Sequence, residues 1–181
     1  MNLKMLKAAL VGLVLSVSGF ANAGLIYNVD SGWEEFSWSG GVGVTSNQDG
    51  FTLELLSDGL LTVVDSFAFG DEFEILINSA FHSLTSNVNP YMNTSVDGDA
   101  DLALASGYSQ GTVFLSAGTY TIDFKLYQSA TVSDGGSPFT GGVAYFKVDT
   151  VNVPEPTTLA IFALGIIGLA SRRSLLAKKK L

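Results

Sequence analysis

The chain has 181 residues, with 17 acidic side chains, 9 basic side chains and no cysteine. The lack of cysteine excludes disulfides, thiol nucleophiles and cysteine-ligated zinc or iron–sulfur sites. Only Lys125 and Lys147 carry positive charge between Gly24 and Val153, a segment that holds 16 acids and a formal net charge of −14. So acidic a segment repels polyanions, and we expect no nucleic-acid partner.

The N-terminal end has the three parts of a secretory signal peptide. Lys4 and Lys7 form a positively charged start, and an apolar run follows from Ala8 to Val17. Ala21-Asn22-Ala23 is a small-residue site for signal peptidase, so cleavage is predicted after Ala23. A retained membrane anchor is the alternative interpretation. Export implies an oxidising compartment, where about 130 residues can still form a core without disulfides.

The segment after the signal peptide has the pattern of an all-β domain. Two tight turns are expected, at Asn78-Ser79 and at Ser116 to Thr119, each joining the strands of a hairpin. One helical turn is expected from Asp101 to Ser106. Short strands and one long mid-chain loop favour a single jelly-roll-like β-sandwich. The strand-like runs cover residues 51–55, 61–69, 73–77, 80–84, 112–115, 120–127 and 143–151.

One run of alternating acids is a candidate metal site. Asp97, Asp99 and Asp101 resemble the start of a calcium loop, because calcium binds several converging oxygens. An EF-hand is excluded, since Leu102 and Tyr108 stand where it needs glycine and glutamate. A simpler calcium loop and a solvated acidic turn remain as alternatives, and no other cofactor is expected.

Two tryptophans beside acids suggest contact with a glycan. Trp33 and Trp38 flank Glu34-Glu35, and exposed rings on a sandwich can stack on sugars. Tyr91 and Tyr108 are further candidates for such stacking. The alternative interpretation is a core tryptophan beside a solvated strand edge.

Signals for catalysis are weak, and we expect the chain not to be an enzyme. His82 is the single histidine, and no Gly-x-Ser-x-Gly elbow accompanies it. One histidine without cysteine does not make a zinc site. A glutamate pair such as Glu34 and Glu35 could in principle hydrolyse a glycoside, so a small secreted hydrolase is kept as the least favoured alternative.

The C-terminal end combines a proline motif, an apolar helix and a basic tail. Pro154-Glu155-Pro156 precedes an uncharged run from Thr157 to Ala170 that is apolar on every face. Its 14 residues would span roughly 21 Å as a helix, short of the usual hydrocarbon thickness. The terminal position and the adjacent Arg172 and Arg173 nevertheless favour a membrane helix with a cytoplasmic basic end over a buried core helix.

This end resembles the PEP-CTERM sorting signal of Gram-negative bacteria. Pro154, Glu155 and Pro156 fit the signature tripeptide, and Arg172 and Arg173 fit the basic cluster that acts as a stop-transfer signal. The resemblance implies recognition and processing near the tripeptide by an exosortase, a membrane-embedded transpeptidase-like enzyme. It also implies an association with exopolysaccharide and biofilm matrix.

The sequence therefore predicts three segments. Residues 1–23 are a signal peptide, residues 24–152 an extracytoplasmic β-sandwich, and residues 153–181 a sorting signal with a transmembrane helix. The expected function is that of an exported, non-catalytic surface or matrix protein that is held in the inner membrane before processing. A carbohydrate-binding module, assisted by calcium, is the second hypothesis.

Overall fold

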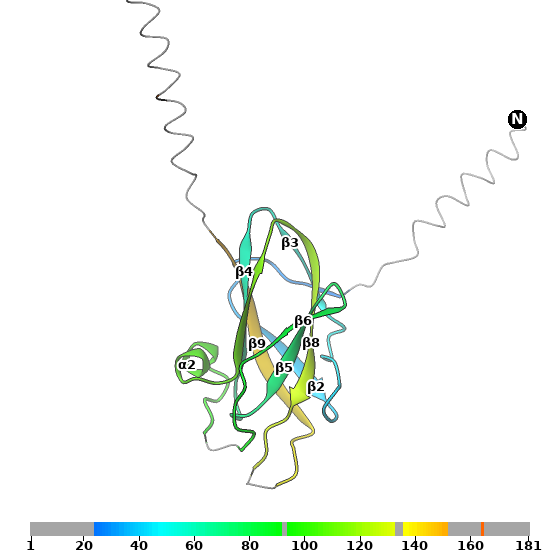
Figure 1. Cartoon of the computed structure of the whole chain (residues 1–181), viewed down its shortest axis with the longest axis vertical. Helices are drawn as coiled ribbons and strands as arrows, with labels where there is room; N and C mark the ends of the chain where they lie inside the picture. The colour runs from blue at the N-terminus through cyan, green and yellow to red at the C-terminus, as the bar shows by residue number, and fades with distance from the viewer. Residues whose placement is uncertain (1–23, 92–93, 133–135, 152–163, 165–181) are drawn as a thin grey trace, which may run out of the picture. The chain divides into compact units, whose positions relative to one another are not determined.

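The computed structural model describes residues 24–91, 94–132 and 136–151, together with residue 164 (Figure 1). The described residues between 24 and 150 belong to one compact unit built from strands and a single short helix. The elements are β1 (Leu25–Ile26), β2 (Glu34–Ser39), β3 (Phe51–Leu55), β4 (Gly59–Asp65), β5 (Glu72–Ile77), β6 (Ala80–Leu84), α2 (Ala100–Ala105), β7 (Gln110–Leu115), β8 (Gly118–Gln128) and β9 (Gly141–Thr150).

The strands form two sheets, as expected for a β-sandwich. One sheet has the order β1-β3-β8-β5-β6, and the other has the order β2-β9-β4-β7. Four antiparallel pairs are nested in the chain: β5 with β6, β4 with β7, β3 with β8, and β2 with β9. The pairing therefore resembles one long hairpin with its tip between β5 and β6, wrapped so that β9 also pairs with β4 and β8 with β5.

The tip of this long hairpin is the turn that the sequence predicts. Asn78 and Ser79 have positive φ angles of 52° and 64°, as the central residues of a type I′ turn require. This backbone twist matches the twist of the flanking strands β5 and β6. The predicted hairpin at Asn78-Ser79 is therefore confirmed.

The second predicted hairpin is wrong. The strands on either side of Ser116 and Ala117 lie in different sheets, because β7 pairs with β4 while β8 pairs with β3 and β5. Asp58 Oδ1 holds the crossing by accepting a hydrogen bond from the Ala117 N–H at 3.1 Å. Turn residues alone do not distinguish a hairpin from a crossing between sheets. The crossing is favoured here because it places the buried Val113 of β7 and the buried Ile122 of β8 on opposite sides of one core.

Phenylalanine rings from both sheets fill that core. Phe36 of β2 stacks on Phe124 of β8 with ring centroids 4.0 Å apart, and meets Phe73 of β5 edge-on at 5.1 Å. Phe51 of β3 lies 4.7 Å from Phe146 of β9. All five are at most 1% exposed, so each ring contributes its full apolar area to burial between the layers.

We expect Phe36→Ala to lower the free energy of unfolding by about 3–5 kcal/mol, because it leaves a cavity between the two layers. Phe114→Ala is the matched control, since Phe114 lies on β7 with 57% of its surface exposed. Removal of an exposed side chain should change stability by about 0.5 kcal/mol or less. Urea unfolding of both variants measures the difference, and equal effects would contradict this description of the core.

Helix α2 covers part of the outer face of the second sheet. Its Ala100 and Ala103 bury against Val64 of β4 and Tyr108 in a second, smaller core. Asp99 begins the helix, since its Oδ1 accepts a hydrogen bond from the Leu102 N–H at 2.9 Å. The predicted helical turn is confirmed, shifted by one residue at each end. Strand β2 was not predicted, although its Phe36 and Trp38 alternate with polar residues.

Candidate functional site

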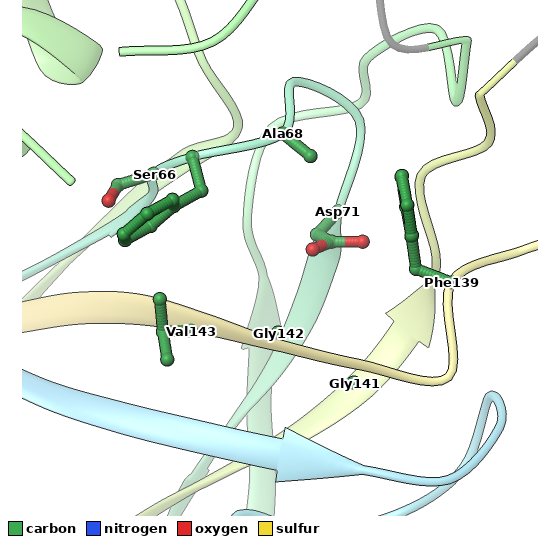
Figure 2. A pocket seen from close by; sticks show the side chains of 8 residues that line it. Ser66, Ala68, Asp71, Phe139, Gly141, Gly142 and Val143 are labelled. Atoms are coloured by element: carbon green, nitrogen blue, oxygen red, sulfur yellow. The ribbon is translucent and has the colours of Figure 1, made fainter. Parts of the chain in front are cut away.

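A cavity of about 380 Å³ opens at one end of the sandwich, between the β4–β5 connection and the start of β9 (Figure 2). In this view the Asp71 carboxyl lies between Ala68 and Phe139, over the Gly141–Gly142 stretch of β9. The walls are mostly apolar. We call this the end cavity, and its lining residues are Ser66, Phe67, Ala68, Asp71, Phe139, Gly141, Gly142 and Val143.

A carboxylate holds the β4–β5 connection in a tight turn. Asp65 Oδ2 accepts hydrogen bonds from the N–H groups of Gly70 and Asp71, both at 3.2 Å. Within this turn Phe67 has a φ of 89°, which is rare for a bulky residue. Its ring lies against Gly98, where an added Cβ would come within 2.8 Å of the ring. The turn therefore fixes Phe67 at the rim of the end cavity with 41% of its surface exposed.

Two buried acids lie at this end of the sandwich. Burial raises the pKa of Asp71 to about 6, although hydrogen bonds from the Ala130 N–H and the Ser129 side chain act in the opposite direction. The pKa of Asp65 is raised well above its usual value, first by burial and then by the negative charge of Asp71. The pair therefore binds protons at pH values where exposed aspartates are ionised.

Some polar atoms at this end have no partner. Among the described residues, Asp65 Oδ1, Ser66 Oγ and Trp38 Nε1 are buried without a hydrogen bond. Leaving such groups unsatisfied usually costs about 1–3 kcal/mol each. Asp65 and Trp38 face the same interior end, because their strands pair with Ala144 and Gly142 on either side of β9. The buried polar atoms that lack a hydrogen-bond partner therefore lie near the end cavity.

The two predicted glycan contacts lie in different environments. Trp38 is 3% exposed and packs over Gly142, where a Cβ would lie 2.9 Å from the indole ring. The prediction that Trp38 contacts a glycan is wrong, because protein atoms cover its ring. Trp33 is half-buried, donates from Nε1 to Asp101 Oδ1 at 2.9 Å, and has Lys147 Nζ 5.0 Å from its ring centroid. These contacts make Trp33 a link between α2 and the sheet.

The predicted calcium ligands are divided among separate contacts. Asp97 accepts from the Ser95 hydroxyl at 3.2 Å, while Asp99 caps α2 and Asp101 binds the Trp33 indole. Among the described residues, no group of three or more acidic or histidine side chains is placed to hold a metal ion. The structure thus gives all three aspartates local structural roles.

The residues considered for catalysis are spread over the surface. His82 lies exposed on β6, with its Nδ1 3.2 Å from Ser83 Oγ. Glu34 and Glu35 begin β2, and Glu35 accepts from the Tyr145 hydroxyl at 3.0 Å. Burial, followed by this bond to Glu35, raises the pKa of Tyr145. None of these residues lines the end cavity.

A second hollow, of about 500 Å³, lies over the outer face of strands β5 and β8. Its lining is more polar and includes Asp49 and Asp123. Asp123 Oδ1 already accepts from the Ser46 hydroxyl and the Phe124 N–H, both at 2.7 Å. None of its lining residues is aromatic, whereas Phe67 and Phe139 line the end cavity, so this hollow is a weaker candidate for binding a ring-shaped ligand.

The C-terminal motif is characterised by comparison with known families. Residues 152–174 match the family model of the PEP-CTERM protein-sorting motif. The chain carries a PEP-CTERM sorting motif. No curated protein and no solved structure matches the chain. The PEP-CTERM motif marks the chain as an exosortase-targeted, exported protein with a membrane-anchored precursor.

Apart from Leu164, the residues of the PEP-CTERM motif lie outside the described residues. Pro154, Glu155 and Pro156 fall there, as do Arg172 and Arg173. The signal-peptide residues Ala21 and Ala23 are also outside, so their roles stay predictions. Within the described part of the chain, no helix has the length and apolar character needed to cross a membrane.

The last strand ends immediately before the PEP-CTERM motif. Asp30 holds Thr150 at the end of β9, accepting from its N–H at 2.7 Å and from its hydroxyl at 3.0 Å. Residues 151–153 alone separate Thr150 from Pro154. Fully extended, three residues reach about 10 Å. Along the chain, the tripeptide therefore lies within a few residues of a hydrogen-bonded strand end.

Proposed function

We propose that the chain is an exported, non-catalytic protein of the cell surface or extracellular matrix, associated with exopolysaccharide. The observation that carries this proposal is the PEP-CTERM motif at residues 152–174, which calls for exosortase processing. The predicted signal peptide and cytoplasmic Arg172 and Arg173 fit an inner-membrane precursor that is later trimmed. Processing would then send the acidic β-sandwich to the surface or matrix.

The character of the sandwich supports a structural or binding role. We infer that it is of jelly-roll type, because its eight long strands are nested as one hairpin wrapped into two four-stranded layers with β1 added at an edge. Its net charge favours solubility and hydration in a matrix. His82 is exposed on β6 and is not among the residues that line the end cavity, which fits a non-catalytic role.

Fractionation of the exporting cell tests this proposal. We expect the processed protein in the extracellular matrix fraction when both an exosortase and exopolysaccharide synthesis are present. Without exosortase, the precursor should stay in the membrane fraction. Without exopolysaccharide, the processed protein should be lost to the medium. Equal amounts of matrix-bound protein in all three backgrounds would contradict the proposal.

A further inference from the structure

We propose that the end cavity binds a single neutral pyranose ring, such as the terminal sugar of a glycan. No residue of this cavity was among the predicted glycan contacts, so the site is distinct from the one that the sequence suggests. The proposal goes beyond delivery to the surface, and it does not depend on C-terminal processing.

The size of the cavity suits one sugar ring. Its volume of about 380 Å³ lies in the lower part of the usual range for small-molecule sites, about 300–1,000 Å³. Gly141 and Gly142 contribute no side chain to the floor below Asp71 (Figure 2). The position of the Trp38 ring keeps Gly142 small, because any Cβ there would collide with the indole. The packing of Trp38 against Gly142 therefore keeps the floor of the cavity free of a side chain at this position.

The apolar walls suit the C–H face of a pyranose. Phe67 and Phe139 contribute aromatic rings, and Ala68 and Val143 contribute aliphatic surface. Phe67 is held at positive φ, a conformation that costs free energy and that folds tend to retain at ligand clamps. A sugar ring presents apolar faces and a polar rim, so it can stack on aromatic surface without losing its hydroxyl contacts.

Asp71 suits the hydroxyl rim of a sugar. Asp71 is a hydrogen-bond acceptor whose Oδ1 already receives the Ala130 N–H at 2.7 Å, and a sugar hydroxyl can donate to the same carboxyl. Ser66 is 1% exposed, and its hydroxyl has no partner among the described residues. The Ser66 Oγ is itself buried and points away from Asp71 in Figure 2, so Asp71 is the side chain that offers the ligand a polar contact.

The negative charge of the domain limits the kinds of ligand further. Asp65 and Asp71 lie at the same end of a strongly acidic domain, so an anionic ligand such as a uronate would be repelled. A cation would have to give up its water among mostly apolar walls, which is costly. A neutral ring with several hydroxyl groups meets both requirements.

Calorimetric titration of the protein purified from the exporting cell tests this site. The probes are the methyl glycosides of glucose, galactose, mannose and N-acetylglucosamine, with methyl glucuronide, hexylamine and cyclohexanol for comparison. We expect saturable binding of at least one neutral glycoside. Phe139→Ala should weaken it about tenfold by removing a ring wall, and Ala68→Phe should abolish it by filling the cavity toward which Ala68 points (Figure 2).

Two further variants separate loss of the site from loss of the fold. Phe81→Ala is the matched control for Phe139→Ala, because Phe81 is 61% exposed on β6 and does not line the cavity. Asp71→Asn keeps a carbonyl acceptor for the Ala130 N–H and should weaken binding several-fold without unfolding the domain. The proposal is overturned if no neutral glycoside binds, if only hexylamine or cyclohexanol binds, or if Ala68→Phe binds as the parent does.

Discussion

Replacing Pro154 and Pro156 with alanine should leave a membrane-bound, unprocessed precursor as the main product. Both prolines lie within the residues that match the PEP-CTERM motif. Proline fixes φ and lacks an N–H, so it should keep this segment out of the apolar helix that the sequence predicts next to it. Alanine is the strongest helix former and would let the helix extend toward Thr150. An enzyme that recognises an extended tripeptide would then lose its substrate.

The matched control is Pro138→Ala, which removes a proline from an exposed loop of the sandwich. This variant should be processed like the parent, because it leaves the tripeptide intact. Immunoblots of membrane and extracellular fractions report both chain length and location. Mature protein of normal size from the Pro154/Pro156 double variant would show that the tripeptide is not what the processing enzyme recognises.

Local sequence patterns predicted the local features of the fold. The alternation in Phe51–Leu55 and the turn at Asn78-Ser79 both appear in the structure, because each depends on neighbouring residues alone. The crossing at Ser116-Ala117 depends on which layer each strand joins. That choice is decided by contacts between distant strands such as β4 and β7. No feature within the turn itself carries this information.

The end cavity was missed for a similar reason. Its walls come from two segments, residues 66–71 and 139–143, that are far apart in the chain. The sequence offered one signal of the cavity, which is Gly141-Gly142 at the start of a strand. Two glycines without side chains leave the backbone open to the approach of a ligand. The Trp38 prediction failed because a tryptophan beside acids looks the same in sequence whether its ring faces the core or the solvent. Register on β9 decides the outcome, as Trp38 pairs with Gly142.

We expect the folded domain to lose stability as the pH rises from about 4 to about 7, because of Asp65 and Asp71. Asp71 has a folded-state pKa of about 6 against an ordinary value of 3.8, and the pKa of Asp65 is raised as well. Between these values the folded chain binds more protons than the unfolded chain, so the free energy of unfolding falls with rising pH. A difference of about two pKa units corresponds to on the order of 3 kcal/mol for Asp71 alone.

Asp71→Asn isolates this contribution, since asparagine keeps an acceptor for the Ala130 N–H and cannot ionise. Urea unfolding at pH 4.5 and pH 8 should show a smaller loss of stability in the variant than in the parent. Asp49→Asn is the matched control, because it removes one exposed carboxylate from the same acidic domain and keeps a residue type that tolerates the φ of 55° at this position. It corrects for general charge repulsion, which also grows with pH. If the Asp71 and Asp49 variants lose stability equally, burial of the acid pair is not the cause. If the free energy of unfolding depends less on pH in the Asp71 variant alone, the buried acids at the end of the sandwich that holds the cavity account for the loss of stability. Negative charge is then tolerated poorly at this end of the fold, and a neutral ligand would add none there.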